Sequence, residues 1–316
     1  MSFVLHDLAP AQQSFAEALR AGLAARPKAV PARFLYDRRG SELFDEITRL
    51  PEYYPTRTEL AILAASAGEI GEALGLGAVL LEFGAGSAGK ALTLLAELER
   101  PAAYAPIDVS LAALEASAEA VGAAHPELTV AAVRADYGQL FPLPPLPGGR
   151  RVGFFPGSTI GNLRPEEARD FLRLWAPRLG PGGAMLVGVD VRKPAPVVRP
   201  AYEDSAGVTE RFILNLLARA NAELGAGFDP AAFAVRVDYD EASGRLSIHL
   251  ESLREQAVGV AGETFAFAAG ERLHVEDSWK YAPDAFQALA SEAGYAPRRV
   301  WCDAGGLFSV HLLELP

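Results

Sequence analysis

The stretch from Ala78 to Lys90, AVLLEFGAGSAGK, decides the fold that this chain adopts. It begins with a short apolar run of β character, continues through a glycine-rich turn and leads into a segment rich in alanine and leucine. This order predicts a strand, a tight turn and a helix, as in nucleoside-binding α/β sheets. Glycine permits positive φ at such a turn and lets a ligand approach the main chain closely.

Two carboxylates accompany the turn. Asp108 ends the next predicted strand about 20 residues further on, the usual distance for a carboxylate that binds a ribose diol. Glu82 stands just before Gly84, the first glycine of the turn. A carboxylate there suits the sulfonium and ammonium of S-adenosylmethionine (SAM) better than the pyrophosphate of a dinucleotide. The alternative is that Glu82 only caps the turn or forms a salt bridge beside it.

Composition sets the class of protein. The chain has 316 residues, of which 50% are hydrophobic, so we expect a globular protein of two domains with a large core. A net charge of −11 argues against a nucleic-acid partner, which needs a basic surface. No apolar run reaches membrane length and no secretory leader is recognisable, so we expect a cytoplasmic protein that binds no membrane. We also expect a monomer.

Cysteine and histidine usage limits the chemistry. The one cysteine, Cys302, excludes an intrachain disulfide, and its apolar surroundings predict a small core residue. The five histidines are scattered without ligand spacing, so we expect no metal site.

The central part of the chain alternates between strands and helices. This alternation predicts a parallel sheet with helices on both faces. The predicted strands are 79–83, 103–107, 129–134, 152–155 and 184–190. Ligands of such sheets bind beyond the carboxyl ends of the strands. We therefore assign Asp136 and Tyr137, after the third strand, to the adenine, although Asp136 is equally well explained as a turn residue. The segment from Gly157 to Asn162, after the fourth strand, is assigned to a second substrate, the alternative being an ordinary turn.

The two ends of the chain add to this sheet. A Pro-rich boundary at 193–200 is followed by a helix, 208–223, and by antiparallel strands that lie outside the first sheet. A C-terminal hairpin, 298–303 and 308–313, completes a seven-strand, Rossmann-like methyltransferase sheet. A nicotinamide-binding domain would instead add a parallel sixth strand, so the hairpin favours SAM and disfavours an oxidoreductase.

The N-terminal region contains tyrosines on both sides of a short predicted helix. Ser41 is the predicted cap of this helix, with Tyr36 before it and Tyr53 after it. Both tyrosines would then contribute to one pocket wall, although packing at the edge of the core explains them as well. A further helix is predicted to begin at a Thr58 cap and to run to Leu74.

Six segments together resemble the histidine N-alpha-methyltransferases of ergothioneine biosynthesis. They are FLYDRRGSELFDEITRLPEYYPTRTE, EFGAGSAGK, PIDVS, FFPGSTIGN, AYEDSAGVTERFILNLL and HVEDSWKY. The first, fourth and sixth are specific to this family, and the resemblance covers roughly residues 30 to 316. It implies a SAM-dependent enzyme that adds three methyl groups in succession to the α-amine of L-histidine, giving hercynine.

The resemblance also implies an architecture and a set of site residues. An α/β SAM-binding domain would comprise 59–198 and 282–316, and an α+β substrate-binding domain would comprise 1–58 and 199–281. The residues that would line the SAM site are Gly84, Gly86, Lys90, Asp108, Asp136 and Tyr137.

For the substrate, the resemblance assigns one group of residues to each part of the amino acid. Their implied roles are Asn162 and Tyr202 for the α-carboxylate, Tyr36, Tyr53 and the Gly157 main chain for the α-amine, and Glu276 and Ser278 for the imidazole. Apart from the resemblance, Glu276 and Ser278 are predicted to follow the last of the antiparallel strands, 272–274, and Glu276 would be interpreted as a surface salt bridge with Lys280, four residues later.

Two departures from the family pattern concern specificity and the turn. Ile248 stands where family members usually carry methionine beside the imidazole, and GAGSAGK lacks the acidic residue often found before its lysine. The alternative function is therefore the same chemistry on another amino acid or derivative, such as a tryptophan-type amine. Retention of Glu276 favours histidine. A SAM-binding regulator without activity is disfavoured by the intact set of tyrosine, asparagine and glutamate.

Overall fold

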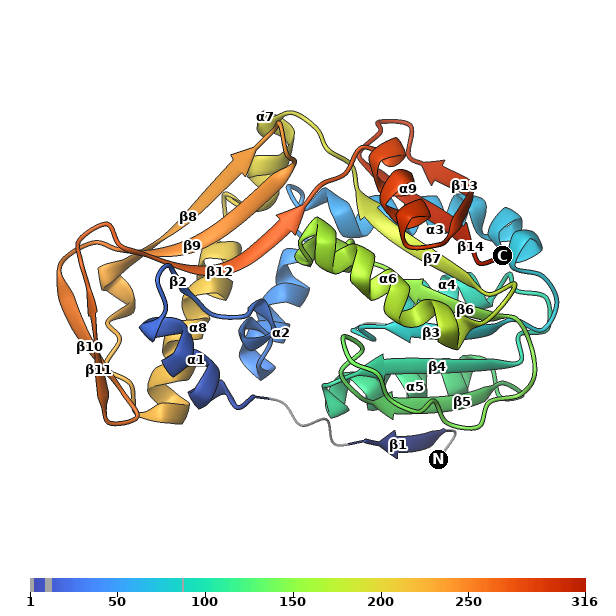
Figure 1. Cartoon of the computed structure of the whole chain (residues 1–316), viewed down its shortest axis with the longest axis horizontal. Helices are drawn as coiled ribbons and strands as arrows, with labels where there is room; N and C mark the ends of the chain where they lie inside the picture. The colour runs from blue at the N-terminus through green and yellow to red at the C-terminus, as the bar shows by residue number, and fades with distance from the viewer. Residues whose placement is uncertain (1–2, 9–12, 87) are drawn as a thin grey trace. The chain divides into compact units, whose positions relative to one another are not determined.

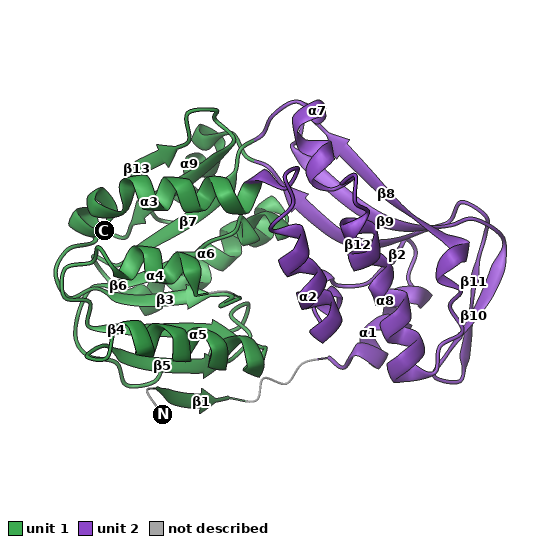
Figure 2. Cartoon of the chain, turned by 180° about the vertical axis from the view of Figure 1, so that it is seen from behind, with its two compact units in different colours: residues 1–11, 55–191, 281–316 green, residues 12–54, 192–280 purple. Residues whose placement is uncertain are grey.

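The computed structural model describes residues 3–8, 13–86 and 88–316. Ser87, in the glycine turn, lies outside the described residues. The chain divides into two compact units (Figure 2). Unit 1 comprises residues 1–11, 55–191 and 281–316, and unit 2 comprises residues 12–54 and 192–280.

Unit 1 is built on a sheet to which the described residues contribute eight strands (Figure 1). Their order is β1-β5-β4-β3-β6-β7-β14-β13. The pairs from β1 to β7 are parallel, and β14 is antiparallel to both β7 and β13. The strands are β1 (Val4–Asp7), β3 (Val79–Phe83), β4 (Ala103–Asp108), β5 (Thr129–Arg134), β6 (Arg151–Phe155), β7 (Ala184–Asp190), β13 (Ala296–Cys302) and β14 (Phe308–Glu314). The predicted α/β class, parallel order and C-terminal hairpin are confirmed.

Helices pack on both faces of this sheet. They are α3 (Tyr54–Leu74), α4 (Gly89–Leu95), α5 (Leu111–Ala124), η2 (Thr159–Asn162), α6 (Pro165–Leu179) and α9 (Pro283–Glu292). Apolar side chains of α3, α4 and α5 pack with Leu80 and Tyr104 in one buried cluster. Phe83 contacts Phe171 and Trp175 of α6. Because side chains alternate along a strand, Leu80 and Phe83 serve opposite faces of the sheet.

Three details of unit 1 differ from the sequence prediction. The sequence assigned residues 1–58 to the substrate domain, whereas β1 pairs in parallel with β5 and adds an eighth strand to the edge of the sheet. The helix predicted from Thr58 begins at Tyr54, so Glu59 lies in its second turn. Cys302 is exposed, because β13 is an edge strand and the side chain of Cys302 lies on its solvent side.

Unit 2 contains a second, smaller sheet in the order β2-β12-β9-β8, together with the hairpin β10-β11. Its strands are β2 (Lys28–Ala29), β8 (Phe233–Asp240), β9 (Arg245–Ser252), β10 (Gln256–Val260), β11 (Glu263–Phe267) and β12 (Arg272–Trp279). Its helices are α1 (Phe15–Ala24), η1 (Ala32–Leu35), α2 (Arg38–Ile47), α7 (Ala195–Val198), η3 (Arg199–Ala201), α8 (Val208–Leu224) and η4 (Pro230–Ala232). The antiparallel pairs β8-β9 and β9-β12 confirm the predicted pairing type.

Two predictions within unit 2 were wrong in detail. Helix α2 is capped by Asp37, whose Oδ1 accepts the Gly40 N–H at 2.7 Å, and not by Ser41. Glu276 and Ser278 were predicted to follow the last strand, but they lie within β12, which continues to Trp279. The strand continues through these residues because β12 pairs with β9 as far as Trp279.

Candidate functional site

The glycine turn follows β3 as predicted. Gly84 has φ of +77°, which a side chain disfavours, and its N–H donates to the Ile107 carbonyl at 2.9 Å. A Cβ atom added at Gly86 or Gly89 would meet no other atom within 4 Å. The turn therefore leaves open space beside its main chain, as a closely bound ligand requires.

Asp108 ends β4 beside this turn. Its Oδ1 accepts the Ser110 N–H at 2.8 Å. Burial raises the pKa of Asp108, while hydrogen bonds from the main chain of Ser110, Val109 and Ala85 act in the opposite direction. Since Ala85 belongs to the glycine turn, the structure brings the carboxylate and the turn together. A partly desolvated acceptor at this place fits the hydroxyls of a ribose.

Tyr137 also approaches the turn, whereas Asp136 bonds locally. The Tyr137 hydroxyl would lie 3.9 Å from a Cβ atom on Gly84, and its ring packs edge-on against Phe155. Asp136 accepts the Gly138 N–H at 2.9 Å and the Gln139 amide at 3.2 Å, which is the turn geometry that the sequence left open. Adenine contact by either residue stays a prediction.

Glu82 is completely buried in β3. It accepts a hydrogen bond from the Tyr104 hydroxyl, which lies 2.8 Å from the Ser117 hydroxyl of α5. Burial raises the pKa of Glu82 to about 7, and the positive charge of Lys90 partly offsets this effect. The carboxylate is thus anchored inside unit 1, and its predicted interaction with the cofactor would act through its charge.

Glu59 is a site residue that the sequence analysis missed. Both of its carboxylate oxygens accept the Gly157 N–H, at 2.9 and 2.8 Å, and Lys90 Nζ lies 2.6 Å from Oε2. A Cβ atom on Gly188 would lie only 2.0 Å from Oε1. One buried carboxylate therefore connects the lysine of the glycine turn with the segment after β6. Its signal was present, since Glu59 falls on the apolar stripe of α3 that includes Ile62.

The segment after β6 is tied to the neighbouring strand. Gly157 has φ of +78° and Ser158 has φ of 55°. The Ser158 hydroxyl accepts the Asp190 N–H from the end of β7 at 2.9 Å. Asn162 closes the short helix η2 and is exposed. The turn is fixed at Gly157 and Ser158, and carboxylate binding by the exposed Asn162 stays a prediction.

In unit 2, the predicted tyrosines belong to one aromatic cluster. The Tyr36 and Tyr53 rings lie 5.4 and 6.2 Å from Phe44, which stands between them. Tyr53 also contacts Tyr202 edge-on, with ring centroids 6.4 Å apart. The rings on the two sides of α2 thus pack in one aromatic cluster with Phe44, which is the packing that the sequence left open, while the pocket wall and the contact with an amine stay predictions.

Tyr202 connects this cluster to β12. Its hydroxyl lies 3.2 Å from the Ser278 hydroxyl. Lys280 Nζ donates to Ser278 Oγ at 2.8 Å and also to the Tyr202 hydroxyl. Lys280 is 2% exposed, so it is a buried cation rather than the surface partner that the sequence suggested. The helical i+4 spacing does not apply, because Glu276 lies in a strand.

Glu276 stands directly opposite Ile248 of β9 in the strand register. Burial raises the pKa of Glu276 to about 7, the charge of Lys280 lowers it and the charge of Asp277 raises it further. No group in the described part of the chain donates a hydrogen bond to this carboxylate. Glu276 is half-buried, and a carboxylate of this kind without a donor is an acceptor for a ligand N–H.

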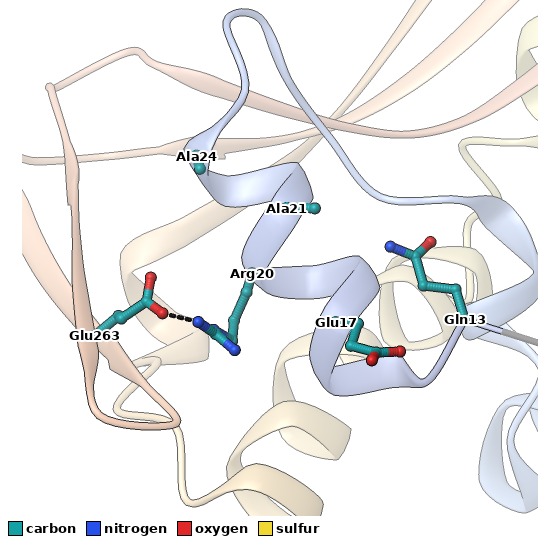
Figure 3. Close-up of a pocket in the computed structure, with 6 residues that line it drawn as sticks. All are labelled: Gln13, Glu17, Arg20, Ala21, Ala24 and Glu263. Atoms are coloured by element: carbon teal, nitrogen blue, oxygen red, sulfur yellow. Dashed lines mark hydrogen bonds and ion pairs between the residues drawn. The ribbon is translucent and has the colours of Figure 1, made fainter.

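A hollow of about 660 Å³ lies elsewhere in unit 2, between α1 and the β10-β11 hairpin (Figure 3). Arg20 and Glu263 form an ion pair across it. It shares no residue with the predicted site. Over the described residues, no helix has the length and apolar character needed to cross a membrane.

The strand order of unit 1, its C-terminal antiparallel hairpin and the carboxylate at the glycine turn together define a SAM-dependent methyltransferase sheet. A family model described as "Histidine-specific methyltransferase, SAM-dependent" matches residues 15–315. The chain belongs to this family, which confirms the resemblance, the enzyme class and the cofactor.

Three curated relatives are similar over almost the whole chain. A histidine N-alpha-methyltransferase of Mycolicibacterium smegmatis is 41% identical, covering 96% of both chains. One of Mycobacterium tuberculosis is 39% identical, covering 92% of both. Ergothioneine biosynthesis protein 1 of Neurospora crassa is 32% identical over 91% of this chain and 33% of its own length.

Proposed function

We propose that this enzyme transfers three methyl groups from SAM to the α-amine of L-histidine, producing hercynine for ergothioneine biosynthesis. The observation that carries the proposal is Glu276, a carboxylate of raised pKa that receives no hydrogen bond within the described residues. The family and the names of the relatives support the same substrate. Hydrogen bonds of this kind discriminate well, because an analogue without the N–H leaves the acceptor unpaired.

The residues of unit 2 fit an imidazole and a carboxylate. Glu276 would accept the ring N–H, and the Ser278 hydroxyl, which lies on the same face of β12, would bond the other ring nitrogen. The Tyr202 hydroxyl would donate to the substrate carboxylate, with Lys280 beside it to supply positive charge. Asn162 of unit 1 is proposed as a second donor to that carboxylate.

The residues of unit 1 fit SAM. Asp108 would accept hydrogen bonds from the ribose diol, and the open main chain at Gly84 and Gly86 would let the amino-acid portion approach. Lys90, Asp136 and Tyr137 complete the proposed site. When bound, SAM supplies an electrophilic methyl group on a sulfonium.

Catalysis would then consist mainly of orientation. Before each transfer the substrate ammonium loses one proton, and the transfer then breaks one S–CH₃ bond, forms one N–CH₃ bond and leaves the cofactor sulfur as a neutral thioether. Holding the reacting groups in line supplies much of the rate, so a strong base is unnecessary if the amine binds uncharged. The Tyr36 and Tyr53 hydroxyls and the Gly157 carbonyl would orient the amine. The Gly157 N–H is already bonded to Glu59, which fixes this peptide.

A second candidate is the same chemistry on another amino acid, such as a tryptophan-type amine. It is favoured by Ile248, which stands opposite Glu276 where the family pattern has methionine. A branched side chain at this position changes the shape of the pocket beside the ring.

The deciding experiment is mass spectrometry of the enzyme with SAM and a mixture of free amino acids. We expect histidine alone to gain methyl groups, up to three. Methylation of tryptophan instead of histidine would reject the proposal and support the second candidate. The absence of any methylated product, with SAM still bound in calorimetry, would favour a regulator over an enzyme.

The cytoplasmic location and the monomeric state remain our expectations. Light scattering coupled to size exclusion should give the mass of a single chain, 33.5 kDa. A mass of twice this value would show that the protein is a dimer and that our expectation is wrong.

A further inference from the structure

Strand β12 contains a bulge immediately before Glu276. Leu273 stands opposite Leu250, and His274 stands opposite His249, but Glu276 rather than Val275 is opposite the next residue of β9. Val275 is therefore an extra residue in β12. A bulge of this kind reverses the alternation of side chains that follow it.

The reversal decides which face Glu276 occupies. One face of β9 carries the buried Leu246, Ile248 and Leu250, and we call it the inner face. Leu273 of β12 shares the inner face, because it pairs with Leu250. In an unbroken strand, Glu276 would point to the opposite, outer face.

With the bulge, Glu276 and Ser278 pair with inner-face residues. Glu276 is opposite Ile248 and Ser278 is opposite Leu246. The Tyr202 hydroxyl reaches Ser278 on this same face. Both residues of the proposed imidazole pocket therefore depend on one additional residue in the strand.

A polar network on the outer face holds the bulge in place. Asp277 Oδ1 accepts hydrogen bonds from His274 Nε2 at 2.9 Å and from the Ser247 hydroxyl at 2.8 Å. Arg245 Nε lies 3.1 Å from Asp277 Oδ2. Burial alone would raise the pKa of Asp277, but the bonds from His274, Arg245 and Ser247 lower it to about 2.

The His274–Asp277 hydrogen bond can form only when the bulge is present. Residues three apart in a regular strand point to opposite faces and cannot bond to each other. His274 and Asp277 share the outer face only because Val275 is inserted between them. The bond thus closes across the bulge and would be lost if β12 returned to regular alternation.

We propose that Asp277 and His274 are positioning residues for substrate recognition: their bond across the β12 bulge holds Glu276 and Ser278 on the inner face. This inference rests on the proposed function, since it takes Glu276 as the acceptor of the substrate ring. Asp277 itself touches no substrate. It acts through the backbone of the strand that it fixes.

The test compares Asp277→Asn with Asp238→Asn in steady-state kinetics. Asp238 is a matched control, because it is an outer-face carboxylate that is bonded to Arg272 at 2.7 Å and does not cross the bulge. We expect Asp277→Asn to raise the KM for histidine about 10-fold, the loss expected for a hydrogen bond to a charged group. The KM for SAM should stay at the level of the unchanged enzyme, and Asp238→Asn should change neither constant by more than about 2-fold.

The inference would be overturned if Asp277→Asn raised the KM for histidine no more than Asp238→Asn does. It would also be overturned if Asp277→Asn raised the KM for SAM as much as the KM for histidine. Thermal unfolding of each variant reports folding. If Asp277→Asn does not fold, His274→Gln takes its place with the same expectation. Glu276→Gln is measured in parallel: if it leaves the KM for histidine unchanged, the imidazole pocket of the proposed function fails, independently of the bulge.

Discussion

Glu82 in β3 and Glu276 in β12 are both carboxyl groups with a raised pKa, but their surroundings differ. Burial raises the pKa of each to about 7. Glu82 receives a hydrogen bond from Tyr104 inside unit 1, whereas Glu276 receives none from the described residues. Glu82 is fully buried and bonded within its own fold, whereas Glu276 is half-buried without such a donor and is therefore available to a ligand. The pKa alone does not separate these two roles, but the hydrogen bonds do.

The same contrast applies to the regions around them. The glycine turn and Asp108 of unit 1 are features that many nucleoside-binding sheets share, and they define the cofactor class. Strand β12 of unit 2, with its bulge, contains Glu276 and Ser278, which we propose bind the side chain of the substrate amino acid. Variants in the two regions should therefore affect different measurements.

The largest expected effect is on substrate recognition. Glu276→Ala should lower kcat/KM for histidine about 100-fold, because a hydrogen bond to a charged group contributes up to about 3 kcal/mol. SAM binding, measured by calorimetry, should stay unchanged. An equal loss of activity and SAM affinity would place Glu276 in the fold, together with Glu82, and end the contrast between them.

Asp108→Ala is the matching change in unit 1. We expect the Kd for SAM to rise about 30-fold through loss of the ribose contact, with the preference among amino acids unchanged. Asp170→Asn, at an exposed position of α6, is the control. Unaltered SAM affinity in Asp108→Ala would remove Asp108 from the ribose site.

Glu59→Gln tests the buried link between Lys90 and Gly157. Glutamine retains an acceptor for the Gly157 N–H but leaves Lys90 without its counter-ion. We expect the free energy of unfolding to fall by about 2 kcal/mol, less than for a fully buried pair because Lys90 is partly exposed. Denaturant unfolding measures the loss, and Glu203→Gln, in an exposed pair with Arg199, should cost less than about 1 kcal/mol. Equal losses would show that burial of Glu59 adds nothing.

Glu82→Gln should change how stability depends on pH. The pKa of Glu82 is higher in the folded chain than in the unfolded chain, so the folded state retains a proton that the unfolded state has lost. Stability from this group therefore falls as pH rises through 7. Between pH 6 and 8 the wild type should lose about 1.4 kcal/mol that Glu82→Gln retains. If the free energy of unfolding depended on pH in the same way for both proteins, the raised pKa of Glu82 would be contradicted.

The smallest expected effect concerns Ile248. Ile248→Met exchanges one buried apolar side chain for another of similar volume, which usually costs less than about 1.5 kcal/mol. We expect kcat/KM for histidine to change less than about 3-fold. A clear gain for histidine, with a loss for another amino acid, would show that Ile248 sets the specificity.

Local patterns predicted much of this molecule. The strand, turn and helix around Gly84, the carboxylate at Asp108 and the antiparallel hairpin at the C-terminus were all readable, because each depends on neighbouring residues. Glu59 was not assigned to the site, since its partner Gly157 is far along the chain. Cys302 was misplaced because an apolar segment does not reveal that its strand lies at an edge.

The sequence by itself determined the chemistry of this protein: a glycine turn with two carboxylates, a terminal hairpin and the family-specific segments. The reason is that these features are set by residue type and short spacing. Only the tertiary structure decided how the site residues point. The bulge at Val275 depends on pairing with a second strand, and it alone reverses Glu276 and Ser278 onto the inner face. The order of residues within β12 contains no sign of that register, because β9 supplies it.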